Sequence, residues 1–279
     1  MLRPAVAVCA LALAGVAGLL AAPRDAPRAD FGHVGSAPAE YGGPSGRRAL
    51  TGPWSVRATR GPARRVSVPY AYNGGDLSMR SFEGSVATYR TTFSLAAAGD
   101  YAIAFGSVQH EATVWLDGRL LARHTGAYLP FEVRARLGAG SHRLAVRADW
   151  RDPLAMRAQG WHRTWFNFGG LGREVTIRRL GASELDSPGL VTRLARGAAV
   201  ATVTVRVRNR AGPRAIAVRG SLAGVPLRFA PVRLGAGRAA WVRARVRLAR
   251  VRLWAPGHPA LYELALAVPG ESGYRAPAA

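Results

Sequence analysis

The sequence predicts an all-β protein built as two β-sandwiches, of which the first is the larger. Short apolar runs recur between Leu50 and Val268, and in many of them apolar and polar residues alternate with a period of two. No segment of useful length shows the 3.6-residue apolar period of an amphipathic helix. The 33 glycines and 18 prolines fit many turns between short strands. Because no βαβ unit is visible, the pattern favours sandwiches over a Rossmann fold or a barrel.

The first 22 residues have the layout of a secretory signal peptide. Arg3 supplies a positive n-region, the run from Ala5 to Leu20 is unbroken and apolar, and small residues precede Pro23. We therefore expect an exported protein, periplasmic or extracellular. The apolar run is also nearly long enough to span a bilayer, so an uncleaved N-terminal anchor is the alternative.

The only cysteine, Cys9, lies inside this leader. The mature chain is therefore expected to have no disulfide and no thiolate chemistry. Residues 23–46 follow, rich in Pro, Gly, Ala, Arg and Ser, and predict a linker.

The first sandwich is predicted over residues 47–182. Asp117-Gly118 stands between two apolar runs and predicts a two-residue hairpin, because both turn positions tolerate a positive φ. The clearest predicted strands are 66–68, 88–95, 101–107, 113–116, 119–123, 131–134, 142–148 and 175–180.

The second sandwich is predicted over residues 183–279. Gly181 to Pro188 is polar and rich in breakers, which predicts a short interdomain joint. The strands expected after it are 190–194, 200–207, 215–222, 226–229, 240–248 and 261–268.

The net charge of +23 invites a nucleic-acid interpretation, which we decline. All 39 basic residues are arginine and none is lysine, a bias that looks like coding composition rather than a phosphate-binding face. In segments 201–208 and 241–248 the arginines alternate with apolar residues, so they belong on the solvated face of strands. An affinity for acidic glycans or for anionic envelope surfaces stays open.

Six short motifs stand in a fixed order between residues 50 and 268. They are Leu50-Thr51-Gly52-Pro53-Trp54, Val68-Pro69 with Phe82-Glu83-Gly84 and Tyr89 to Phe93, Ala112 to Gly118, His124 to Phe131, Asn167 to Val175, and Leu253 to Tyr262. Together they resemble the front half of family 2 glycoside hydrolases, which include β-galactosidases, β-glucuronidases and β-mannosidases. One motif alone would be weak, but six in the family's order are specific.

The resemblance implies a jelly-roll, galactose-binding-like domain over residues 47–182, followed by a smaller immunoglobulin-like sandwich over 183–279. Trp254 and Tyr262 are expected to close the core of the second sandwich. The other aromatic and glycine motifs are expected to be mostly structural. Gly169-Gly170 should let the backbone turn tightly beside an aromatic cluster.

Family members hydrolyse glycosides with two glutamates carried on a third, (β/α)₈ domain. The chain stops at Ala279, before any such domain, so we expect no catalytic residue in it and no activity alone. Glu111 beside His110 is the nearest acid–base pair, but adjacent strand residues face opposite sides of the sheet. Segment 270–279 does not look like the last strand of the family's second domain, which predicts a truncated sandwich with an unpaired edge.

A carbohydrate site is predicted at Trp161, His162, Trp165 and Asn167, whose indoles could stack on sugar rings. Many catalytic members carry an aspartate three residues before this asparagine, where the present chain has Thr164. The competing interpretation is that these aromatic residues pack within the sandwich or against a barrel.

No cofactor or metal is predicted, because the histidines lack ligand spacing and no P-loop or nucleophile elbow occurs. The leading hypothesis is the non-catalytic front portion of an exported family 2 glycosidase. The alternatives are a stand-alone secreted carbohydrate-binding module and a basic adhesion module for anionic polymers. The histidines are His33, His110, His124, His142, His162 and His258.

Overall fold

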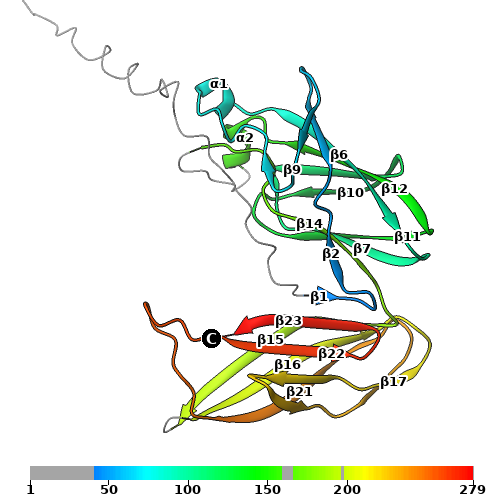
Figure 1. Ribbon diagram of the computed structural model, residues 1–279, viewed down its shortest axis with the longest axis vertical. Coiled ribbons are helices and arrows are strands. Elements are labelled where there is room, and N and C mark those ends of the chain that lie inside the picture. Colours follow the sequence, from blue (N-terminus) through cyan, green and yellow to red (C-terminus); the bar gives the residue numbers. More distant parts are fainter. Residues whose placement is uncertain (1–40, 159–165, 196–197, 279) are drawn as a thin grey trace, which may run out of the picture.

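The computed structural model describes residues 41–158, 166–195 and 198–278, and these form two β-sandwiches (Figure 1). Apart from the short blue strand β1 (Tyr41–Gly42), which lies beside the red C-terminal strand, the first sandwich runs from blue to green in Figure 1 and the second from yellow to red. The all-β prediction is therefore confirmed. The predicted signal peptide and residues 23–40 of the predicted linker lie outside the described residues.

The first sandwich consists of a six-stranded sheet packed against a four-stranded sheet. Every strand pair in both sheets is antiparallel. In spatial order the larger sheet contains β10 (Arg119–Thr125), β9 (Glu111–Leu116), β12 (Gly140–Asp149), β6 (Val86–Leu95), β3 (Trp54–Ala58) and β4 (Arg64–Val66). The smaller sheet contains β11 (Phe131–Leu137), β7 (Gly99–Phe105), β14 (Val175–Arg179) and β2 (Arg47–Ala49).

A third, small sheet closes one end of this sandwich. It consists of β5 (Tyr70–Ala71), β13 (Gly170–Leu171) and β8 (Val108–Gln109). Two short helices, α1 (Met79–Phe82) and α2 (Pro153–Ala158), lie at the same end (Figure 1).

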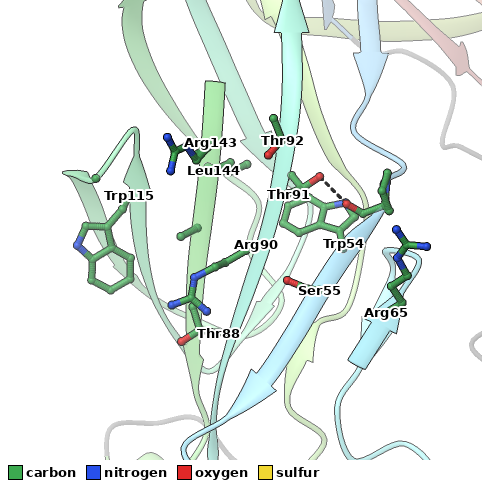
Figure 2. A pocket seen from close by; sticks show the side chains of 13 residues that line it. Trp54, Ser55, Arg65, Thr88, Arg90, Thr91, Thr92, Trp115, Arg143 and Leu144 are labelled. Atoms are coloured by element: carbon green, nitrogen blue, oxygen red, sulfur yellow. Dashed lines mark hydrogen bonds between the residues drawn. The ribbon is translucent and has the colours of Figure 1, made fainter. Parts of the chain in front are cut away.

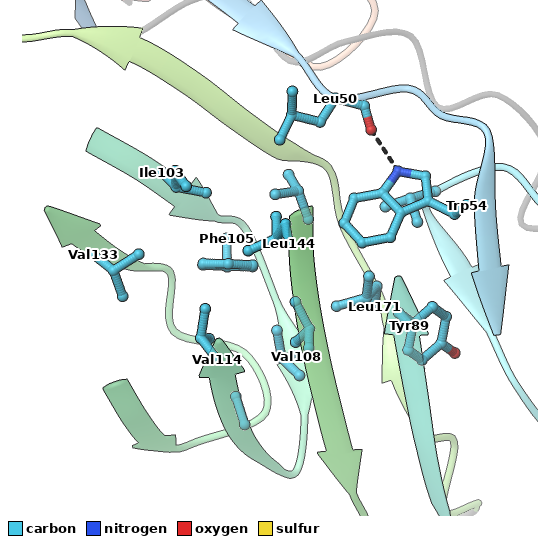
Figure 3. Close-up of a cluster of buried hydrophobic side chains, with 14 of the residues drawn as sticks. Leu50, Trp54, Tyr89, Ile103, Phe105, Val108, Val114, Val133, Leu144 and Leu171 are labelled. Carbon is cyan, nitrogen blue, oxygen red and sulfur yellow. Dashed lines mark hydrogen bonds between the residues drawn. The ribbon is translucent and has the colours of Figure 1, made fainter. Parts of the chain in front are cut away.

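Period-two alternation fills the core between the two large sheets. On β6 the burial alternates strictly from Tyr89 to Leu95, as the sequence pattern predicts. Trp54 is fully buried, and its indole Nε1 donates a hydrogen bond of 2.6 Å to the carbonyl oxygen of Leu50 (Figure 3). The tryptophan of the first motif is therefore a core residue whose single polar atom has a partner.

The predicted hairpin at Asp117-Gly118 is confirmed between β9 and β10. Both residues have positive φ, 52° and 83°, as a two-residue turn of this kind requires. The Asp117 carboxylate also holds the neighbouring strand β12, because Oδ1 accepts from the Arg143 backbone N–H at 2.7 Å.

The second sandwich pairs a three-stranded sheet with a five-stranded one. The first contains β15 (Ser183–Ala195), β16 (Ala198–Asn209) and β21 (Ala239–Ala249). The second contains β1 (Tyr41–Gly42), β23 (Ser272–Ala278), β22 (Tyr262–Val268), β18 (Arg219–Leu222) and β19 (Val225–Arg228). A pair formed by β17 (Arg214–Ile216) and β20 (Val232–Leu234) completes it.

The predicted joint over Gly181 to Pro188 is too long, because β15 begins at Ser183 and only Gly181 and Ala182 of that range lie outside it. The strand contains a bulge between Asp186 and Gly189, which takes up Ser187 and Pro188. Since β15 is an edge strand, a proline without an N–H donor costs it no internal ladder bond.

The expected loss of the last strand is also wrong. Residues Ser272–Ala278 form β23, which pairs with β22 along its whole length. The partner on its other side, β1, reaches only Gly273 and Tyr274, so Pro277 lies on an open edge where proline is tolerated. The same pairing places Tyr41–Gly42, part of the predicted linker, in the second sandwich.

One of the two aromatic residues expected to close the second core does not do so. Tyr262 packs against that core, and its hydroxyl bonds the backbone of Arg252. Trp254 is 53% exposed, in a loop flanked by the exposed Leu253. The sequence motif predicts a buried pair, but the loop between β21 and β22 turns Trp254 outward.

Candidate carbohydrate site

Only one of the four predicted site residues belongs to the part of the chain that the structure describes. Trp161, His162 and Trp165, together with Thr164, lie outside the described residues. Asn167 follows them directly and is fully buried. Their role in carbohydrate binding stays a prediction, and the described part of this region is centred on Asn167.

Two buried asparagines tie together the loops at the closed end of the first sandwich. Asn167 Nδ2 donates to the carbonyl oxygens of Trp150 (2.8 Å) and Phe82 (2.9 Å). Asn73 Nδ2 donates to the carbonyl oxygen of Asn167 at 3.0 Å, and Asn73 Oδ1 accepts from the Gly169 N–H at 2.9 Å. The Asn167 amide thus positions the loops, and its side chain has no exposed surface to offer a sugar.

The structural role predicted for Gly169-Gly170 is borne out by the contacts around both residues. A Cβ at Gly169 would lie 1.8 Å from the indole of Trp150, and one at Gly170 would lie 2.2 Å from the hydroxyl of Tyr89. Gly170 also has a φ of +119°, which side chains rarely allow. The pair therefore lets the backbone pass directly over an aromatic core.

A hollow of about 750 Å³ opens beside this network, and its polar lining was missed by sequence reasoning. Its wall includes Tyr72, whose ring packs on Trp150 with centroids 5.8 Å apart and lies under the Arg64 guanidinium. Two carboxylates, Asp76 and Glu83, also line it. The other charged lining residues are Arg60, Arg64, Arg80 and Arg151.

The sequence held only an indirect signal for this hollow. Its lining comes from the loops after β3, after β5 and after β12, which are far apart in the chain. Only the folded topology brings them together, although Phe82-Glu83-Gly84 was already singled out as a family motif.

The Asp149 carboxyl, next in sequence to the lining residues Trp150 and Arg151, is held in its charged form. Burial of the Asp149 carboxyl raises its pKa, but hydrogen bonds from Arg151 and the charges of Arg151 and Arg147 outweigh burial and lower the pKa. Arg151 donates to both carboxylate oxygens, at 3.0 and 2.7 Å. A glycosidase acid needs the opposite shift, so Asp149 is unsuited to protonate a leaving group.

The Glu111–His110 pair does not form an acid–base unit. His110 is buried at the bend between β8 and β9, whereas Glu111 is exposed at the start of β9. Across the described ranges, no group of three His, Cys, Asp or Glu side chains is placed to hold a metal ion. No helix in those ranges is long and apolar enough to cross a membrane.

Comparisons with known proteins support the resemblance in sequence. No family model matches the chain. A β-glucuronidase of Canis lupus familiaris is 34% identical over 47% of this chain, and one of Paenibacillus borealis is 29% identical over 41%. The chain spans only about a fifth of the length of these relatives, 21% and 23%.

Solved structures support the resemblance in fold. A family 2 β-galacturonidase of Eisenbergiella tayi superposes with a TM-score of 0.69 at 23% identity, covering 83% of this chain and 42% of its own. A β-glucuronidase from glycoside hydrolase family 2 superposes with a TM-score of 0.67 at 16% identity, covering 88% and 30%. The chain therefore resembles the β-sandwich region of family 2 glycoside hydrolases, in sequence over nearly half its length and in fold over most of it.

Proposed function

We propose that this chain is the non-catalytic β-sandwich region of a family 2 glycosidase, and that it supports and orients a catalytic domain rather than hydrolysing glycosides itself. The proposal rests on the structural match to a β-galacturonidase. The matched fold covers 83% of this chain but only 42% of that enzyme. The matched structure is a β-galacturonidase and the matched relatives are β-glucuronidases. We therefore propose β-glycosides of uronic acids as the substrate class of the complete enzyme.

The carboxylates of the described residues support the non-catalytic assignment. Glu132 and Glu184 both bind the guanidinium of Arg178, at 2.9 and 3.0 Å, and so serve as structural ion-pair partners. The two carboxyl groups with a resolved shift, Asp117 and Asp149, both have lowered pKa values. Neither group fits a general acid, whose pKa must be raised.

An exposed apolar patch on the second sandwich supports the docking role. Leu253, Trp254 and Leu261 are each more than half exposed, and beside them lies an apolar hollow of about 150 Å³. Ala278, the last described residue, lines the same hollow. A domain that follows β23 would leave the sandwich at this patch and could cover it.

The test is an activity assay of the full chain on chromogenic β-glucuronides, β-galacturonides and β-galactosides. We expect the chain to release no more chromophore than a buffer control does. The protein concentration should be one at which a complete β-glucuronidase releases the chromophore rapidly. Hydrolysis that disappears on a single Glu→Gln or Asp→Asn substitution in this chain would overturn the proposal.

Export is a further part of the proposal and rests on the sequence of residues 1–22 alone. N-terminal sequencing of the protein recovered from a bacterial periplasm or medium is expected to begin near Pro23. Recovery of the intact Met1 N-terminus from the membrane fraction would instead favour the anchor.

A further inference from the structure

The outer face of the six-stranded sheet carries a second hollow, which shares no lining residue with the one beside Asn167 and which the proposed function does not use. It measures about 800 Å³ and lies over β9, β12, β6, β3 and β4 (Figure 2). Its lining combines two tryptophans, of which Trp54 is fully buried and Trp115 is not, with several guanidinium groups and the hydroxyls of serine and threonine.

The strand register places the key side chains in one row across the sheet. Trp115 pairs with Ala145, Ala145 with Arg90, Arg90 with Ser55, and Ser55 with Arg65. Small side chains thus alternate with large ones, so Ala145 and Ser55 leave room on either side of Arg90. At about 4.8 Å per strand spacing, the row extends roughly 19 Å, which suits an oligosaccharide rather than a single sugar.

Two arginines of this hollow, Arg65 and Arg90, form no ion pair with any carboxylate of the described residues. Arg143 also lies outside these ion pairs, but the nearby Asp117 carboxylate attracts its guanidinium. That carboxylate is bonded to His142 and to the backbone N–H of Arg143. An uncompensated guanidinium is a strong and directional site for a carboxylate, which it can bind through two parallel hydrogen bonds.

Trp115 supplies the complementary apolar contact. Its indole is only partly buried and projects from β9 beside the hollow (Figure 2). The adjacent Ala145 leaves one side of the indole uncrowded, and the C–H face of a pyranose ring can pack on such a surface. Thr88 and Thr92, on either side of Arg90 along β6, add hydroxyls that can donate to or accept from sugar hydroxyls.

We propose that this hollow binds an acidic oligosaccharide, with a sugar ring on Trp115 and uronate carboxylates on Arg90 and the flanking Arg65 or Arg143. The assignment of the ligand to acidic sugars rests on the proposed function, while the presence of an anion site follows from the hollow itself. A single-stranded nucleic acid is the rival occupant, but such grooves stack successive bases on several aromatic residues. Of the two tryptophans that line this hollow, Trp54 is fully buried, which leaves Trp115 for stacking.

Calorimetric titration of the full chain with oligogalacturonides of four to six residues tests the proposal. Cello-oligosaccharides of the same length serve as the neutral ligand, and oligo(dT) serves as the nucleic acid. We expect the oligogalacturonide to bind, the neutral ligand to bind at least about tenfold more weakly, and Arg90→Gln to weaken oligogalacturonide binding by at least about tenfold.

Arg243→Gln is the matched control, because Arg243 is an exposed arginine on β21 of the second sandwich. Its substitution lowers the net charge by the same amount as Arg90→Gln. Trp115→Ala should also weaken binding while the melting temperature changes little. Equal losses in the Arg90 and Arg243 variants, no binding of oligogalacturonide, or tighter binding of oligo(dT) would each overturn the proposal. None of these outcomes bears on whether the chain supports a catalytic domain, which the hydrolysis assay tests separately.

Discussion

Arg178, on the last strand of the first sandwich, forms a two-pronged ion pair with Glu184, on the first strand of the second. Nη1 lies 3.1 Å from Oε1 and Nη2 lies 3.0 Å from Oε2, and both side chains are largely buried. Only five residues separate them in the chain, so the pair acts as a clamp at the point where the chain passes from one sandwich to the other. Glu132 of β11 joins the same guanidinium at 2.9 Å.

Glu184→Gln should lower the free energy of unfolding by about 2–3 kcal/mol, because it leaves a buried guanidinium with one acidic partner instead of two. Urea denaturation of the full chain measures the change. Glu263→Gln is the matched control, since Glu263 pairs with Arg275 on the surface and exposed pairs contribute within about 0.5 kcal/mol. Equal effects of the two substitutions would show that the clamp does not stabilise the interface.

This clamp illustrates what sequence reasoning could and could not supply. The strands on either side of it follow from period-two alternation, which depends only on local burial and therefore appears in the sequence. The joint between the sandwiches was predicted too long, because Ser187 and Pro188 are typical of a joint, yet a bulge on an edge strand accommodates them. The last strand was missed for the same reason, since Pro277 is tolerated only where β23 has no outer partner.

The site was less predictable than the fold. The motif that contains Asn167 is visible in the sequence, but the burial of its side chain is not, because its amide bonds the carbonyls of Phe82 and Trp150 from other parts of the chain. The row from Trp115 to Arg65 exists only through the register of five strands, and no local pattern specifies that register.

The pair formed by His142 and Asp117 predicts a pH dependence of stability. Its two atoms, His142 Nδ1 and Asp117 Oδ2, lie 2.7 Å apart. The hydrogen bond to Asp117 raises the pKa of His142 above its usual 6.5, despite partial burial. Burial raises the pKa of Asp117, but the hydrogen bonds from His142 and the Arg143 N–H outweigh it and lower the pKa below 3.8.

A raised histidine pKa adds stability that is complete below pH 6.5 and is lost as the pH rises through the folded value. A lowered aspartate pKa adds stability that is present above pH 3.8 and is lost as the pH falls through the folded value. His142→Gln should therefore destabilise the protein more at pH 5.5 than at pH 8.5, as measured by urea midpoints at both values. A loss that is the same at both pH values would mean that only packing against Phe93 is removed.

Gly169→Ala should be among the most damaging single substitutions in the chain. The added methyl group would lie 1.8 Å from the Trp150 ring, inside a core that cannot shift without breaking the Asn73 and Asn167 hydrogen bonds. We expect a loss of about 3 kcal/mol or more in the free energy of unfolding. Gly138→Ala is the control, because a Cβ there would meet no atom within 4 Å, and a thermal melt of both variants makes the comparison.

The exposed patch on the second sandwich predicts a change in surface behaviour without a change in stability. Replacing Trp254 and Leu261 with serine removes large apolar side chains that are 53% and 58% exposed and lie outside the buried core of the second sandwich. We expect the double variant to bind less of a hydrophobic dye and to associate less at high concentration, with an unchanged melting temperature. Trp241→Ser, on the outer face of β21 and 60% exposed, is the control for losing a single surface indole, and should change dye binding less. A marked drop in the melting temperature of the double variant would place Trp254 and Leu261 in the core instead, and would remove the support that this patch gives to a docked catalytic domain.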